Sequence, residues 1–381
     1  MSLTEKATIA RTTTNGHHQQ HHRKMVISEE ESPQQFALRI KNMVTNGLQA
    51  LAISVAARHG VFEVMKSPKT SYEIAQEAGL KERYVRELLH SFVVSRIVEM
   101  NPDKNTYHIA PQHLPFLTGK HSLAGMTCLV PMLCEGYSQV NECFKIDGPS
   151  GVSYDQYPGF QEFMDHMSNM MHNQTLLSDF VPSVDGLEKR LESGISVLDI
   201  GCGRARAPLI LAQRFPHSNF YGIDISVDAV ATAQKEASRK GLKNTTFLVK
   251  DAASLPSEWS EKFDFVTAFD CIHDQAEPEA VLRESKRVLK SDGVFSMLEL
   301  AVSSHPWKNI GNPRALDGYV ISMFHCMPVS LYMEGKGLGT MWGKENILET
   351  LSQIGFRDVK VHKCKDMFNF HYVCRKEINE I

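Results

Sequence analysis

The chain lacks the features that mark membrane, secreted and nucleic-acid-binding proteins. Its 381 residues contain no apolar run near the roughly 20 residues that a membrane-spanning helix needs, and no apolar signal core follows Met1. The formal net charge is only −3, so the composition gives no electrostatic reason for binding nucleic acid or an acidic membrane. We therefore expect a cytoplasmic protein with neither of these partners.

Paired cysteines are also missing. The eight cysteines occur singly, without a Cys-x-x-Cys pair, at positions 128, 134, 143, 202, 271, 326, 364 and 374. This spacing predicts neither a disulfide framework nor a zinc site, so we expect a reducing compartment and no bound metal. The tract His17–His22 is able to bind metal in principle. Its polar surroundings favour a solvated, disordered tail over residues 1–34.

The most informative segment present is an apolar strand that ends in a glycine-spaced turn. Val197–Ile200 runs into Gly201–Gly203, and Asp199 stands two residues before the first glycine. Glycines allow a sharp turn and let a ligand lie against the main chain at the carboxyl end of a strand. A dinucleotide turn would have a third glycine where this chain has Arg206, and Asp199 would repel its pyrophosphate. The turn favours a cationic ligand, S-adenosyl-L-methionine (SAM).

Three further strands, expected at 219–225, 246–250 and 263–270, end at the same edge of the predicted sheet. Asp224 follows the first strand at the distance that suits an acid binding ribose hydroxyls. Asp251 and Ala252 offer an acceptor and a backbone N–H for adenine. The candidate cofactor-binding residues are therefore Asp199, Gly201, Cys202, Gly203, Asp224, Ile225, Asp251, Ala252, Phe269 and Asp270.

This Asp-x-Gly-x-Gly turn with its acidic strand ends resembles the class I SAM-dependent methyltransferases. The family's usual turn has another glycine where this chain has Ala205. The resemblance implies an α/β fold with a doubly wound, seven-stranded Rossmann-like sheet that binds SAM. The alternative is that the carboxylates only cap helices.

The front half has a different pattern. Apolar residues recur at helical spacing from Phe36 to Val55, and 70–89 reads as a helix, a glycine turn and a second helix. Two short strands follow at 97–100 and 106–109. This mostly α winged helix resembles the N-terminal domain of small-molecule O-methyltransferases, where it serves dimerisation, so a homodimer is expected. The chain looks closest to winged-helix methyltransferases known mainly from bacteria, fungi and nematodes.

A DNA-binding regulator that responds to SAM without methyl transfer is the alternative function. Glu82 and Glu87 stand among the bases of the second helix and would repel phosphate, which disfavours this alternative. We expect a tail at 1–34, the winged helix at 35–120, a helical linker that covers the substrate at 121–190 and the SAM-binding domain at 191–381, with an insertion at 305–342.

The resemblance also suggests catalytic residues. A His-Asp pair stands between the fourth strand and the next helix in plant-type small-molecule O-methyltransferases, which makes His273 the candidate general base. Glu299 ends the adjacent strand, and Glu345 lies in a segment resembling the family's Gly-Lys-Glu, which supplies a second acid near the base. Either carboxylate would orient the imidazole.

The acceptor is expected to be a small-molecule hydroxyl or thiol. A thiol needs less help from a base, because it is already partly ionised near neutral pH. Met164, Met167 and Met171 share one helical face, which is either a core stripe or part of the substrate site. The candidate substrate-binding residues, from this helix and the insertion, are Met167, Met171, His325, Met327 and Trp342.

Overall fold

The computed structural model describes residues 31–119, 122–364 and 368–376. Most of the tail expected at 1–34 therefore lies outside the described residues. The described chain forms two compact units, one from 31–142 and 154–170 and the other from 143–153 and 171 onward. The stretch expected to be one linker, 121–190, is divided between them, because helix α7 (Phe160–Thr175) belongs partly to each.

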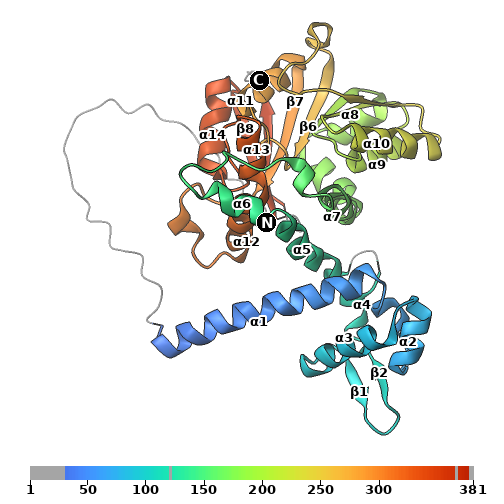
Figure 1. Ribbon diagram of the computed structural model, residues 1–381. Coiled ribbons are helices and arrows are strands. Elements are labelled where there is room, and N and C mark those ends of the chain that lie inside the picture. Colours follow the sequence, from blue (N-terminus) through green and yellow to red (C-terminus); the bar gives the residue numbers. More distant parts are fainter. Residues whose placement is uncertain (1–30, 120–121, 365–367, 377–381) are drawn as a thin grey trace. The chain divides into compact units, whose positions relative to one another are not determined.

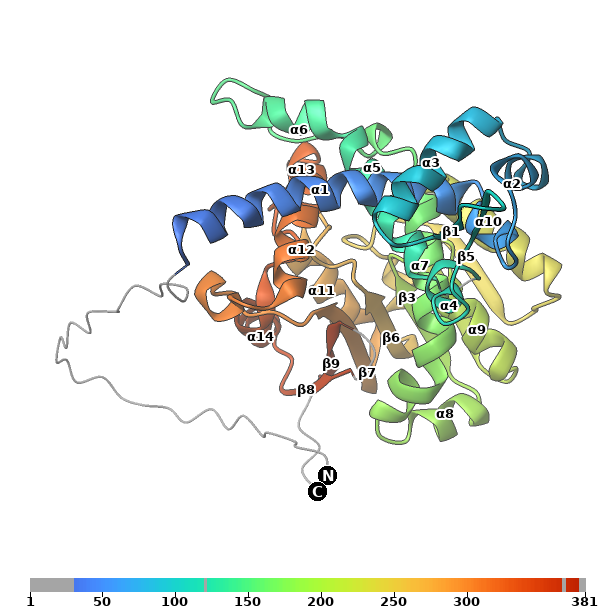
Figure 2. The ribbon, with the colours of Figure 1, turned by 90° about the horizontal axis from the view of Figure 1, so that it is seen from below.

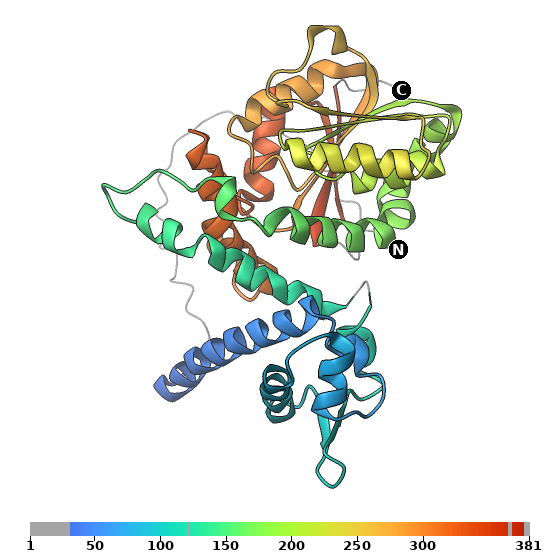
Figure 3. The ribbon, with the colours of Figure 1, turned by 45° about the vertical axis from the view of Figure 1, so that its right-hand side comes forward.

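The first unit is a winged helix-turn-helix. Helix α1 (Pro33–Arg58) starts in a capping box of Ser32 and Gln35, and α2 (Ser71–Ala78) ends at Gly79, whose φ is +68°. Helix α3 (Glu82–Val94) leads to the wing, an antiparallel pair of β1 (Glu99–Asn101) and β2 (Thr106–His108), which projects from the helices in Figure 3. These elements confirm the predicted winged helix. Shorter helices complete the unit: α4 (Leu114–Leu117), α5 (Leu129–Glu135) and α6 (Tyr137–Cys143).

Buried side chains hold this unit together, but one face of α1 has no cover within it. The core gathers Phe62, Ile74, Leu89, Phe92 and Tyr107. Along α1, the exposed large apolar side chains are Phe36, Leu38, Ile40, Met43, Val44, Leu48, Leu51 and Val55.

The second unit is built on a seven-stranded sheet with the order β5-β4-β3-β6-β7-β9-β8. Its strands are β3 (Ser196–Ile200), β4 (Asn219–Asp224), β5 (Thr245–Val249), β6 (Phe263–Phe269), β7 (Leu289–Leu300), β8 (Asp358–Lys363) and β9 (Asn369–Arg375). The pairs from β5 to β7 are parallel, and β9 is antiparallel to β7 and β8. This arrangement confirms the predicted doubly wound Rossmann-like sheet. The parallel strands bring their carboxyl ends to one edge.

Helices cover both faces of the sheet (Figures 1 and 2). Side chains of α8 (Leu187–Ser193), α9 (Arg206–Arg214) and α10 (Val227–Arg239) pack on one face, and those of α11 (Pro278–Val288) and α14 (Gly343–Ile354) on the other. Because β3 and β6 lie in the middle of the sheet and are covered on both sides, they are almost continuously buried. Among the described residues, no helix is both long and apolar enough to cross a bilayer.

Some element boundaries differ from the expected ones. Strand β5, for example, runs from Thr245 to Val249, one residue before the expected 246–250. Helix α9 begins at Arg206, because Ala205 has a left-handed φ of +58° that a helix does not continue through. Helix α11 ends at Val288, and strand β7 begins directly after it at Leu289. The insertion at 305–342 is largely helical, with α12 (Pro313–Ile321), a π-helical turn (Ser322–Cys326) and α13 (Met327–Tyr332).

Candidate functional site

The glycine turn after β3 has the conformation that its sequence predicts. Gly201 and Gly203 have φ values of +62° and +53°, a region that other residues rarely adopt. A Cβ on Gly201 would lie 2.8 Å from Sγ of Cys271, so this position has no room for a side chain. The Cys202 N–H donates to the carbonyl of Ile223 over 2.9 Å, which ties the turn to the end of β4.

Asp224 ends β4, beside the glycine turn. Its Oδ2 accepts a hydrogen bond from the Gly203 N–H, and its Oδ1 accepts one from the Ser226 N–H, each over 2.8 Å. The carboxylate therefore joins the glycine turn to the strand tip. Burial raises the pKa of Asp224, against these backbone hydrogen bonds, which lower it. The next residue, Ile225, is 53% exposed and presents an apolar surface beside the carboxylate.

Asp199 is buried one strand away. Thr267 on β6 donates its hydroxyl to Asp199 Oδ1 over 2.6 Å. Burial, with a smaller contribution from the nearby charge of Asp224, raises the pKa of Asp199 to about 7. Two carboxylates that repel each other in a low-dielectric environment make a site that a cation would stabilise.

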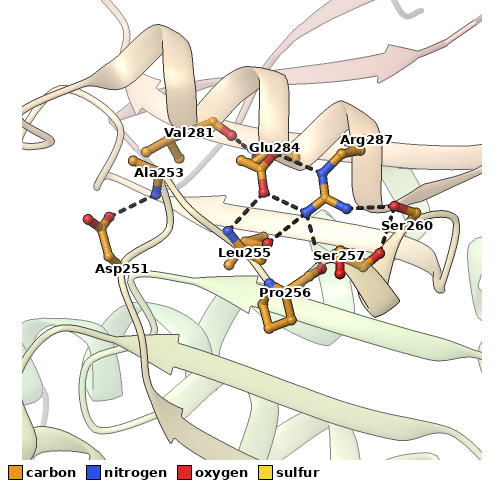
Figure 4. Close-up of polar contacts among 10 residues, drawn as sticks. Asp251, Ala253, Leu255, Pro256, Ser257, Ser260, Val281, Glu284 and Arg287 are labelled. Atoms are coloured by element: carbon orange, nitrogen blue, oxygen red, sulfur yellow. Dashed lines mark hydrogen bonds and ion pairs between the residues drawn. The ribbon is translucent and has the colours of Figure 1, made fainter.

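The loop after β5 is rigidly braced. Asp251 accepts a hydrogen bond from the Ala253 N–H over 2.8 Å, and Ala252 between them is buried. Glu284 on α11 accepts from the Leu255 N–H over 2.8 Å (Figure 4). Arg287 donates to the carbonyl groups of Leu255 and Pro256 and to the hydroxyl of Ser260. This bracing fixes the position of the Asp251–Ala252 backbone.

The tip of β6 carries Phe269 and Asp270. Asp270 has a left-handed φ of +48° and is hydrogen-bonded by the side-chain amide of Asn369. Burial, together with the charge of Glu299, raises the pKa of Asp270 to about 7. The Phe269 ring meets the His172 ring edge-on, with centroids 4.8 Å apart. This contact places the end of α7 that belongs to the second unit against the strand tip.

His273 and Glu299 form a buried pair beyond β6. Nδ1 of His273 lies 2.5 Å from Oε2 of Glu299 at the tip of β7, and Nε2 lies 3.3 Å from Oδ1 of Asp274. Burial alone would lower the pKa of His273, but the charges of Glu299 and Asp274 outweigh it and raise this pKa well above its usual value. The imidazole is therefore a stronger base than an ordinary histidine.

Glu345 does not contact this pair. Its carboxylate accepts hydrogen bonds from the Ser303 hydroxyl and the Ser304 N–H, and it pairs with Lys308 at 3.1 Å. Burial tends to raise its pKa, but these hydrogen bonds and Lys308 hold it at about 2. Of the two glutamates, Glu299 is the one that contacts the imidazole of His273. The Glu345 carboxylate anchors the first turn of α14 to the loop after β7, and its role as a second acid near His273 stays a prediction.

The expected substrate residues are not gathered at one place. His325 is buried near His273 and Asp274, and burial lowers its pKa to about 4. Trp342 packs into the main core under α14, and Met171 packs beside Leu176 and Phe180. Met327, on the first turn of α13, is only partly buried. Met167 belongs to the first unit, so the structure does not relate it to the site.

Sequence reasoning did not single out two buried groups at this edge. Cys326 lies within reach of His273 and Asp274, and His172 lies against Phe269. Cys326 stands at the end of the π-helical turn, a feature that often marks functional sites. Its neighbour His325 was the only signal in the sequence, because the contact of Cys326 with His273 depends on how the insertion packs on the sheet.

Comparisons with known proteins agree with this architecture. A family model described as a methyltransferase domain matches residues 191–315, and one described as an Rv2258c-like winged HTH domain matches residues 47–119. Demethylmenaquinone methyltransferase of Listeria monocytogenes is 27% identical over 177 residues, which cover 45% of this chain and 73% of that protein.

Two solved structures illustrate the shared fold. An O-methyltransferase family protein from Burkholderia thailandensis superposes with a TM-score of 0.68 at 12% identity, over 90% of this chain and 99% of that one. Human N-acetylserotonin methyltransferase, solved in complex with SAM, superposes with a TM-score of 0.61 at 16% identity, over 92% and 99% of the two chains.

Proposed function

We propose a methyl-transfer reaction for this protein, which combines a class I methyltransferase domain with an N-terminal winged helix-turn-helix domain. The methyl donor is SAM, and the acceptor is the hydroxyl or thiol of a small molecule. The observation that carries this proposal is the buried carboxylate pair Asp199 and Asp224 on the glycine turn, which suits a ligand with both cationic and hydroxyl groups.

Each part of SAM has a matching group at this edge. The ammonium and sulfonium would be stabilised by Asp199, and the ribose hydroxyls would donate to Asp224. The adenine would lie between Ile225 and the braced loop at Asp251 and Ala252. The complex of human N-acetylserotonin methyltransferase with SAM supports this assignment, because its chain has the same fold.

His273 would remove the proton of a hydroxyl acceptor as the methyl group is transferred. Glu299 on Nδ1 fixes the tautomer and stabilises the imidazolium that forms. The acceptor oxygen then attacks the methyl carbon, and the bond from that carbon to the sulfonium sulfur breaks. Transfer to an electrophilic sulfonium depends chiefly on alignment, so the strand tips contribute by positioning both reactants.

The DNA-binding alternative is not favoured. On α3, Arg83 pairs with Glu87 at 2.5 Å and Arg86 with Glu82 at 3.3 Å, so the basic side chains already have acidic neighbours. The exposed apolar face of α1 instead suits a second copy of the chain, and we propose a homodimer.

Binding and product analysis test the function. Calorimetry of the full chain should detect SAM and S-adenosylhomocysteine binding, and Asp224→Ala should weaken it by about 1.5–3 kcal/mol, the range for a lost hydrogen bond to a charged group. Asp228→Ala, on the exposed first turn of α10, is the matched control. Incubation with labelled SAM and a metabolite extract should yield a labelled small molecule. Absence of both SAM binding and labelled product would refute the proposal.

A further inference from the structure

The cluster beyond β6 contains three groups that metals bind. Nε2 of His273, Oδ1 of Asp274 and Sγ of Cys326 all lie within 4.8 Å of one another. His273 and Cys326 are buried, and the Asp274 side chain is 17% exposed. These donors come from the loop after β6 and from the π-helical turn of the insertion.

The spacing fits one small ion. Zinc binds nitrogen and oxygen at about 2.0–2.2 Å and sulfur at about 2.3 Å, so neighbouring ligands of a tetrahedral site lie about 3.3–3.7 Å apart. The observed 3.3 Å between His273 Nε2 and Asp274 Oδ1 already has this length. The third donor, Cys326 Sγ, lies within 4.8 Å of both atoms, so a small shift of its side chain would bring it to the distance of a third tetrahedral ligand.

The surroundings of the three donors also suit a ligand. Asp274 Oδ1 is buried, and it lies 3.3 Å from His273 Nε2 and beside Cys326. Glu299 occupies Nδ1 of His273, which leaves Nε2 to face the other two donors. A carboxylate on the far nitrogen is the usual support of a metal-bound histidine.

The ligand chemistry selects the metal. One thiolate, one imidazole and one carboxylate suit a borderline-soft divalent ion such as Zn²⁺ and not Mg²⁺ or Ca²⁺, which prefer oxygen. A thiolate and a carboxylate together neutralise the two positive charges of the ion, as a buried site requires. Three protein ligands leave a fourth position open, which is the pattern of catalytic zinc sites.

We propose that His273, Asp274 and Cys326 bind a Zn²⁺ ion whose open position takes the acceptor as a thiolate. This inference rests on the proposed methyl-transfer function and narrows its acceptor to a thiol. The thiol binds the ion and releases its proton to solvent. Its sulfur then forms a bond to the methyl carbon of SAM as the carbon–sulfonium bond breaks, which gives a methyl thioether and S-adenosylhomocysteine.

In the zinc-bound protein, His273 would be a metal ligand. The metal ion, and not the imidazole, would then ionise the acceptor thiol. A thiol with an ordinary pKa near about 8.5 is mostly protonated at pH 7. Binding to zinc ionises it outright. Zinc should therefore raise the rate with a thiol and suppress the rate with a phenol, because the phenol needs the free imidazole.

The metal site is tested on the full chain with Co²⁺ as a spectroscopic probe. We expect one Co²⁺ to bind with the charge-transfer absorption of a cobalt–thiolate bond, and Zn²⁺ to displace it. Cys326→Ala should abolish this absorption. Asp274→Asn, which keeps the side chain's shape on a partly exposed residue, should weaken metal binding at least tenfold. Cys374→Ala, at an equally buried thiol on β9, should leave the absorption unchanged.

Separate measurements keep this test apart from the proposed function. Unchanged SAM affinity, measured by calorimetry for each variant, shows that the fold and the cofactor site are intact. A wild-type protein that does not bind SAM would refute methyl transfer itself. Wild-type protein that binds SAM but shows no cobalt–thiolate absorption would overturn the metal site. Protein that binds zinc but methylates 2-mercaptoethanol no faster at pH 7 than the chelator-treated protein would overturn the thiolate role.

Discussion

Replacing Asp199 with asparagine should make the ligand-free protein more stable and its SAM complex weaker. The change keeps the shape of the side chain, and the asparagine oxygen is still able to accept the hydrogen bond from Thr267. It removes a charge that burial and Asp224 destabilise in the folded state.

The expected size follows from the pKa of Asp199, which is about 7 in the folded protein against an ordinary 3.8. The folded state therefore holds a proton that the unfolded state has lost, so stability falls as the pH rises from about 4 to about 7 and then levels off. At about 1.4 kcal/mol per pH unit, the asparagine variant should be more stable than the wild type by about 4 kcal/mol at pH 8 and by about 2 kcal/mol at pH 5.

Tryptophan fluorescence is a suitable probe, because all three tryptophans, at 259, 307 and 342, belong to the second unit, which contains Asp199. Denaturant unfolding of wild type and Asp199→Asn at pH 5 and pH 8 gives the difference directly. Asp228→Asn, at an exposed position, is the control for loss of one negative charge. A variant that is less stable at pH 8, or a stability difference that does not change with pH, would refute the reasoning.

The same carboxylate should govern cofactor binding. A cationic ligand favours the ionised form of Asp199, so the affinity for SAM should rise as the pH increases toward about 7. In Asp199→Asn this pH dependence should largely disappear, and the affinity should fall at least tenfold. Calorimetry of both proteins between pH 6 and pH 8 checks this expectation.

Three other outcomes are expected. With a phenolic acceptor and a chelator present, His273→Ala should lower turnover about 100-fold. The wild-type rate should keep rising with pH well beyond 6.5, because the neutral imidazole is the active form and its pKa is raised. A pH-rate profile of both proteins measures the two effects. Glu345→Gln should lower the melting temperature of the second unit without changing the pH-rate profile, whereas Glu299→Gln should shift this profile to lower pH. Thermal unfolding, measured beside the pH-rate profile, separates the two roles. Light scattering should show that the protein without residues 1–34 is still a dimer and that the protein without residues 1–120 is a monomer. A filter-binding assay should find no sequence-selective DNA complex.

The sheet and the acidic residues at its strand ends could be predicted because they depend on short-range patterns. A buried parallel strand is apolar along its whole length, and the residue at its carboxyl end is fixed by where that run stops. Asp199, Asp224 and Asp270 were found in this way. The partners of Asp199 and Asp224 are also near in the topology, since β4 and β6 both lie beside β3.

The surroundings of His273 could not be predicted in the same way. Glu299 follows from the position of β7 beside β6, but the placement of Glu345 and Cys326 depends on segments outside the strands. Glu345 turns toward Ser303 and Ser304 because α14 starts against the loop after β7. No periodicity in the sequence encodes which way a helix start or a π-helical turn faces.

The concentration of buried acids at this edge is itself an argument for function. Asp199 and Glu299 are buried and Asp270 is half-buried, and among the described residues His273 is the cationic partner of Glu299. The burial of a charge without a partner destabilises a fold. Asparagine or glutamine would fill the same space at a smaller penalty. Groups of this kind are concentrated at active sites, where a ligand supplies the missing charge. A sulfonium cofactor would do so beside Asp199, and a divalent ion would do so beside His273, so one electrostatic feature of the strand tips accounts for both ligands.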